Sequence, residues 1–129
     1  MTSIGIRNQI NSPPDGIIVT ISQGMLKEKG YRNWLRNFFY AMEQEDWTYW
    51  IRQATKPKYD FYYVYLCIGN RIRYRVNFVS AEGPGWVSFH DGKKMYARTW
   101  IIVCGPVVEA PKIIPMKGFR GFRYTPLLF

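Results

Sequence analysis

Residues 60–79 carry the pattern that most constrains this chain, and it is the pattern of a β-hairpin. A dense run of aromatic and β-branched residues, Asp60 to Ile68, is followed by Gly69-Asn70 and then by a second run, Arg71 to Val79. Two residues of this type between two such runs predict a primed-type turn, whose backbone twist matches that of the paired strands. The fold must therefore include a sheet built around this hairpin.

The second run alternates two kinds of side chain, with Ile72, Tyr74, Val76 and Phe78 set against Arg71, Arg73, Arg75 and Asn77. Because successive strand residues point to opposite faces, the alternation predicts one buried face and one basic face. The three guanidinium groups would stand about 7 Å apart along the strand, close to the spacing of successive phosphates on a nucleic-acid strand. A solvated face that protects a sheet edge explains the same pattern equally well.

The segments before the hairpin predict a strand followed by helices. Residues 17–21 form a β-branched run of strand length. Apolar residues between Trp34 and Met42 recur at spacings of three and four, which indicates a helix with one apolar face. A second, short helix is expected from Asp46, carrying Trp47, Trp50 and Ile51.

The segments after the hairpin predict further strands. Residues 86–89 suggest a short strand, 90–94 a turn, and 95–108 a strand region in which Gly105-Pro106 marks a bulge or an edge. Residues 118–124 are expected to pack as a final strand.

In that final strand, Phe119 and Phe122 can share a face only if Gly121 introduces a bulge. Such a bulge would turn Arg120 and Arg123 toward one side.

This order of elements predicts an α+β fold. We expect a small, mainly antiparallel and partly open β-barrel, with one or two helices after the first strand. A length of 129 residues suits one domain, which we place at residues 16–129 after a polar N-terminal tail at residues 1–15.

Composition narrows the classes of function. Eighteen Lys and Arg against nine Asp and Glu give a net charge of +9, and aromatic residues make up 18% of the chain. Cations attract phosphates and aromatic faces stack on bases, so this excess of basic and aromatic residues favours nucleic acid as the partner.

Other classes of protein find no support in the sequence. Two cysteines and one histidine do not supply a zinc module, and no cofactor-binding motif is present. No apolar run approaches the roughly 20 residues of a membrane helix, and no secretory signal is visible, so a cytoplasmic location without membrane contact is expected.

The layout resembles the PUA-like superfamily, which includes the ASCH, EVE and YTH domains. The resemblance is carried by the first strand at 17–21, the helices around Trp34 and Trp47, the hairpin 62–79, and the late segments 99–108 and 118–124. It implies a pseudobarrel that binds RNA or DNA, often with a flipped or modified base held in an aromatic pocket. Some members of the group are small hydrolases or nucleases. The Gly-x-Lys-x-x-Glu signature of ASCH domains and the Arg-Asn-Tyr segment of EVE domains are absent, so no residue roles are carried over.

The candidate site residues are basic or aromatic. For nucleic-acid contact they are Arg71, Arg73, Arg75, Lys117, Arg120 and Arg123; for an aromatic pocket they are Trp47, Trp50, Trp86 and Tyr124. The glycines at 118 and 121 would let the backbone approach a ligand, although a closing strand with aromatic packing explains this segment as well.

The sequence thus favours a non-catalytic nucleic-acid-binding module over an enzyme. One alternative is a small metal-independent nuclease or hydrolase built on His90, whose surroundings are also those of an ordinary hairpin turn. The other alternative is an interaction module for an acidic protein partner.

Overall fold

The computed structural model describes residues 13–21, 30–44, 47–88 and 92–129. In chain order the elements are β1 (Gly16–Thr20), α3 (Tyr31–Glu43), β2 (Tyr49–Gln53), β3 (Tyr63–Cys67), β4 (Arg71–Glu82), β5 (Gly85–Ser88), β6 (Lys94–Ala97), β7 (Thr99–Pro115) and β8 (Phe122–Thr125).

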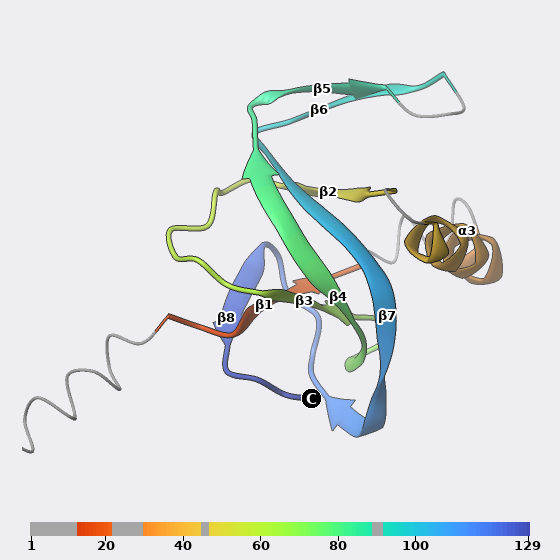
Figure 1. Ribbon diagram of the computed structural model, residues 1–129, viewed down its shortest axis with the longest axis vertical. Helices are drawn as coiled ribbons and strands as arrows, with labels where there is room; N and C mark the ends of the chain where they lie inside the picture. The colour runs from red at the N-terminus through yellow and green to blue at the C-terminus, as the bar shows by residue number, and fades with distance from the viewer. Residues whose placement is uncertain (1–12, 22–29, 45–46, 89–91) are drawn as a thin grey trace, which may run out of the picture.

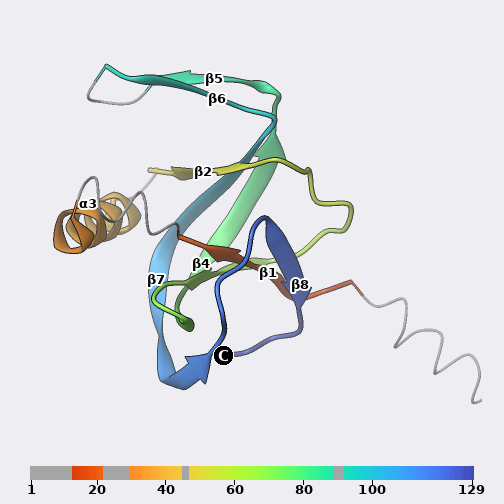
Figure 2. The ribbon, with the colours of Figure 1, turned by 180° about the vertical axis from the view of Figure 1, so that it is seen from behind.

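Six of the strands form one mixed sheet in the order β2-β7-β4-β3-β1-β8. Only β1 and β3 run parallel; the other neighbours are antiparallel. The sheet curls into a half-barrel, with the long strands β4 and β7 crossing it and α3 beside β2 and β7 (Figure 1). β5 and β6 form a separate hairpin that extends from the ends of β4 and β7 (Figure 2).

One apolar core explains the curl of the sheet. Buried side chains from β1, β2, β3, β4 and β7 belong to a single cluster, and half-buried Phe122 and Tyr124 of β8 pack against it. The two edge strands, β2 and β8, therefore contribute to the same interior, which requires the sheet to wrap around it. The expected small α+β, partly open barrel is confirmed at this level.

The helix supplies the other side of this core. Trp34, Phe38 and Met42 of α3 are buried in the cluster, at the spacing of four that places them on one helix face. The indole Nε1 of Trp34 donates a hydrogen bond to the Tyr49 hydroxyl of β2 over 3.0 Å. Burial raises the pKa of that hydroxyl, and the hydrogen bond from Trp34 lowers it by less.

The prediction of a second helix over Trp47 and Trp50 is wrong, because residues 49–53 form β2. Trp50 pairs with Ile102 and Ile51 with Ile101 of β7. Ile51 is buried in the core, whereas Arg52 is exposed. Aromatic and β-branched residues favour strands, and pairing with β7 uses that preference where a short isolated helix would have little support.

The β3–β4 hairpin is confirmed, with its predicted turn. Gly69 and Asn70 both have positive φ angles, of 60° and 61°, as a type I′ turn requires. The regular alternation along β4 is interrupted, however. The register shifts so that Cys67 pairs with Ile72 while Leu66 pairs with Tyr74, which leaves Arg73 as the extra residue of a bulge. Ile72 consequently packs in a second cluster, apart from Tyr74 and Val76.

That second cluster lies on the outer face of the sheet. Ile18, Tyr65, Cys67 and Ile72 are buried there under partly buried apolar residues, among them Ile114, Met116, Phe119, Leu128 and Phe129. The end of β7 and the last residues of the chain thus cover the outer face. This cover explains why the arginines on β4 are half-buried rather than fully exposed.

The last predicted strand is present as β8, which pairs antiparallel with β1. Gly121 precedes this strand, with φ 77°, and is not a bulge within it. Phe119 therefore lies on the outer face while Phe122 faces the core, so the two rings do not share a face. Asp15 fastens the same region, because its backbone N–H donates to Thr125 and its carboxylate accepts from the Leu127 N–H.

At Gly105 the helix packs directly against the sheet. The predicted bulge is confirmed, since Arg75 pairs with Val108 and Asn77 with Cys104, leaving residues 105–107 opposite Val76. A Cβ atom at Gly105 would lie 2.1 Å from the main-chain oxygen of Met42 in the last turn of α3. Only a residue without a side chain allows this approach of helix and strand.

We expect Gly105→Ala to lower the free energy of unfolding by about 1–3 kcal/mol, because the methyl group overlaps the helix backbone. The matched control is Gly85→Ala, whose Cβ would meet nothing within 4 Å and which should stay within about 0.5 kcal/mol of the parent. Urea unfolding measures both. Equal stability of the two variants would show that α3 does not pack on β7 in this way.

We expect Tyr49→Phe to lower the free energy of unfolding by about 1–3 kcal/mol, because it leaves the indole N–H of Trp34 buried without an acceptor. Trp34 is only 3% exposed, so water cannot easily replace the lost hydroxyl. Thermal unfolding followed by tryptophan fluorescence gives the value. A variant as stable as the parent would mean that the indole finds another partner.

Candidate functional site

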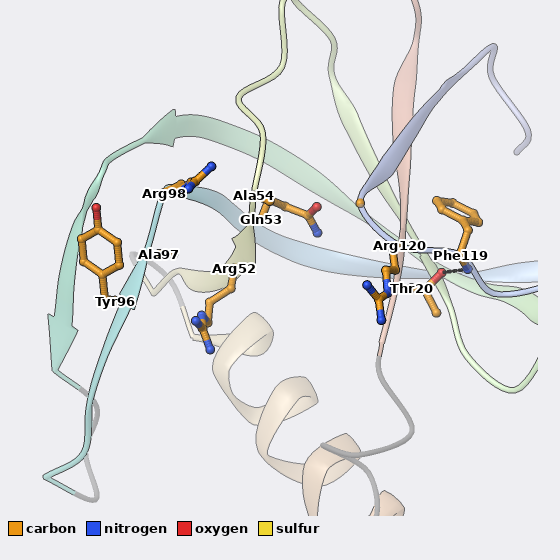
Figure 3. Close-up of a pocket in the computed structure, with 10 residues that line it drawn as sticks. Thr20, Arg52, Gln53, Ala54, Tyr96, Ala97, Arg98, Phe119 and Arg120 are labelled. Carbon is orange, nitrogen blue, oxygen red and sulfur yellow. Dashed lines mark hydrogen bonds between the residues drawn. The ribbon is translucent and has the colours of Figure 1, made fainter.

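An open cleft of about 570 Å³ lies where the curled sheet fails to close. Its walls come from the ends of four segments: Thr20 of β1, residues 52–54 at the end of β2, residues 96–98 at the end of β6, and the turn 119–121 before β8. Figure 3 shows Phe119 and Arg120 on one side and Tyr96 and Arg98 on the other, with Arg52 between them in the view. Because β2 and β8 are the edge strands of the sheet, the cleft occupies the gap between its two edges.

The lining of this cleft is cationic. Arg52, Arg98 and Arg120 are all exposed, and no Asp or Glu lines the cleft among the residues that the structure describes. Within the same part of the chain, none of the three guanidinium groups has a hydrogen bond or an ion pair. We call this site the arginine cleft. Three arginines from different segments, without a counter-charge, make it a place where an anion gains favourable electrostatic energy.

Two aromatic rings complete the arginine cleft. Tyr96 is 43% exposed and Phe119 is half-buried. The Phe119 N–H donates to the Thr20 hydroxyl over 3.2 Å, which holds the turn 119–121 against the end of β1 (Figure 3). The cleft therefore combines planar cations with ring faces, the pair of groups that recognises phosphates and bases.

The three arginines predicted on β4 do not form a free row. The Arg73 Nε donates to the main-chain oxygen of Ile68 over 3.1 Å, across the hairpin turn. The Arg75 guanidinium lies 4.4 Å from the centre of the Tyr63 ring and donates to the main-chain oxygen of Phe129. Arg71 is half-buried opposite Pro115. The protein itself thus uses two of these side chains in holding the outer face together.

The basic residues near β8 have different surroundings. Arg120 lines the arginine cleft, whereas Arg123 lies 4.2 Å above the centre of the Phe119 ring. Lys117 is exposed in the connection between β7 and β8 and does not line the cleft. Only Arg120 of the basic residues predicted for the site is therefore in the cleft.

The four aromatic pocket candidates come from separate places. Trp47, 41% exposed, contacts Tyr40 of α3, and Trp50 donates to the Thr48 hydroxyl over 2.9 Å. Tyr124 accepts a hydrogen bond from the Lys58 N–H over 2.7 Å. Trp86 stands on the β5–β6 hairpin. The structure does not gather them into one pocket.

His90, the candidate for an enzymatic alternative, lies outside the described residues. Among the residues that are described, no three His, Cys, Asp or Glu side chains come together as a metal site would need. No helix in that part of the chain is long and apolar enough to span a membrane.

Sequence reasoning did not find Arg52, Tyr96 or Arg98. Arg52 fell within a segment predicted to be helical, and Arg98 fell within the predicted strand region 95–108, whose partner strand could not be assigned. Alternation would have helped here, because the exposed residues Tyr96 and Arg98 flank Ala97, which the fold buries.

The two cysteines differ in their surroundings. Cys67 is buried, its thiol donates to the main-chain oxygen of Met116 over 3.3 Å, and burial raises its pKa, although a hydrogen bond with Thr20 lowers it by less. Cys104 is half-buried on β7.

We expect a thiol reagent near pH 8 to modify Cys104 in the folded protein and Cys67 only after unfolding, since the thiolate is the reactive form. The free energy of unfolding should also fall as the pH rises above 9.0, the ordinary pKa of a cysteine thiol. Above that pH the Cys67 thiol ionises in the unfolded chain, while the folded protein keeps it protonated. Counting modified thiols in Cys67→Ala and Cys104→Ala tests the assignment. Rapid modification of Cys67 in the native protein would contradict it.

Comparison of the chain with protein-family models, with curated proteins and with solved structures found no match.

Proposed function

We propose that this protein binds nucleic acid, with phosphate groups held in the arginine cleft. The observation that carries the proposal is the convergence of Arg52, Arg98 and Arg120 on one opening without an acidic residue among the described lining. Guanidinium groups bind phosphate oxygens in pairs of parallel hydrogen bonds, and a polyanion with regularly spaced charges can engage several of them at once.

The overall charge supports the same proposal. A net charge of +9 draws polyanions to the whole surface. A site within that field needs side chains that are not already used, and the cleft arginines meet this condition while Arg73 and Arg75 do not. We therefore move the proposed phosphate contacts from β4 to the gap between β2 and β8.

A PUA-like architecture belongs to this proposal as well. It is supported by the curled, partly open sheet with one helix packed against it, which is the coarse layout that the order of elements led us to expect. Under this proposal, the open side of the half-barrel is the side that receives the ligand.

The triple variant Arg52→Gln, Arg98→Gln, Arg120→Gln should bind labelled DNA and RNA oligonucleotides more weakly than the parent. Removing three phosphate contacts should also make the slope of log K against log salt less steep, by about two for a single strand and about three for a duplex. Fluorescence anisotropy at increasing KCl gives both quantities. Because all three residues are exposed, the variant should fold like the parent.

A charge-matched control separates the cleft from the general field. Arg32, Arg36 and Lys112 are exposed and do not line the cleft, so replacing them with Gln removes the same charge elsewhere. Equal losses in the two triple variants would refute a specific site. If the parent protein binds no oligonucleotide but does bind an acidic polypeptide, the result favours the alternative of an acidic protein partner.

A further inference from the structure

The β5–β6 hairpin presents an aromatic pair to solvent. Trp86 is 70% exposed and Tyr96 is 43% exposed. The two residues pair across the hairpin, and their ring centres lie 5.6 Å apart. Such a large exposed tryptophan is unusual, because burying the apolar surface of its ring is favourable.

The register puts both rings on the same face of the hairpin. Residues that pair directly across antiparallel strands point the same way, and Lys94, two positions before Tyr96, shares that face. The opposite face carries Ala97, which is only 5% exposed. The Trp100 indole donates to the main-chain oxygen of Gly85 over 3.0 Å and fastens the base of the hairpin to the main sheet. The hairpin is thus anchored on one side and open on the other.

This aromatic face continues directly from the arginine cleft. Tyr96 belongs to both, since it pairs with Trp86 and also lines the cleft beside Arg98. Neither β5 nor β6 contains an acidic residue. A strand whose phosphates lie among the arginines can therefore extend its bases toward Tyr96 and Trp86 along two β-strands that carry no acidic residue.

We infer that the β5–β6 hairpin stacks unpaired bases, so that the nucleic acid bound by this protein is single-stranded. The inference rests on the proposed function and adds the substrate class. Stacking on a side chain needs a base whose face is free, and in a duplex both faces are already covered by neighbouring base pairs. Phosphates alone would not distinguish the two forms.

Stabilisation of the hairpin accounts for part of the Trp86–Tyr96 contact but not for its exposure. A cross-strand aromatic pair adds modestly to the stability of a two-stranded hairpin, which is marginal by itself. A pair of β-branched residues would give comparable strand preference. What only the rings supply is an open π surface next to cations.

The experiment compares Trp86→Val with Trp86→Phe, since Trp86 does not line the arginine cleft. Valine keeps the strand preference and removes the ring, whereas phenylalanine keeps an aromatic ring at this position. The probes are a labelled oligothymidylate strand and the same strand annealed to oligoadenylate. The valine variant should bind the single strand about tenfold more weakly and the duplex as the parent does, because it loses the stacking of one base. The phenylalanine variant should stay close to the parent.

Backbone amide shifts show whether the hairpin is intact in each variant. If valine disrupts the hairpin, the fluorescence of Trp86 is measured instead, as the difference between the parent and Trp86→Phe. Quenching of this fluorescence by the single strand and not by the duplex supports the inference, and no quenching overturns it. An intact valine variant with unchanged binding of the single strand, or with equal losses for both probes, also overturns it. The triple glutamine variant of the arginine cleft should bind both probes more weakly than the parent. If it does so while the valine variant binds the single strand as the parent does, the proposed function stands and only this inference fails. Both proposals fall if the parent binds neither probe.

Discussion

One shared apolar interior determines the architecture of this protein. Side chains from both edge strands and from the helix face reach the same core, and a flat sheet of six strands could not bring its edges to one place. The curl in turn makes β4 and β7 long and irregular. Their register shifts at several points, including the stretch around Gly105, against which the last turn of α3 packs. The bulge at residues 105–107 thus lets the sheet accommodate the helix and is not a defect in the sheet.

Much of the fold could be predicted because its strongest patterns are local. The Gly69-Asn70 turn needs two residues with positive φ, and the sequence offers residues suited to that conformation between two strand-like runs. The helix face from Trp34 to Met42 follows from spacing alone. β2 was missed because its preference for a strand is expressed only through pairing with β7, a partner about fifty residues away.

The candidate site was harder to predict because it is non-local. The alternation along β4 correctly separated apolar from basic residues over part of its length, yet nothing local shows that the chain returns to engage Arg75 through Phe129. The bulge at Arg73 also depends on the partner strand. Of the predicted basic residues, Arg120 lines the arginine cleft, and it does so beside residues from β2 and β6 that pattern analysis had no reason to group together.

The unclosed gap between β2 and β8 has a consequence for the mechanics of the fold. In a closed barrel, backbone hydrogen bonds join the first and last strands and fix the width of the interior. Here Arg52 and Arg120 stand on the two sides of the gap. A polyanion held by both would connect the edges through side chains, so that a bound ligand becomes part of the wall. Ligand binding would then make the half-barrel more rigid. The free energy of unfolding would rise with the logarithm of the ligand concentration once that concentration exceeds the dissociation constant.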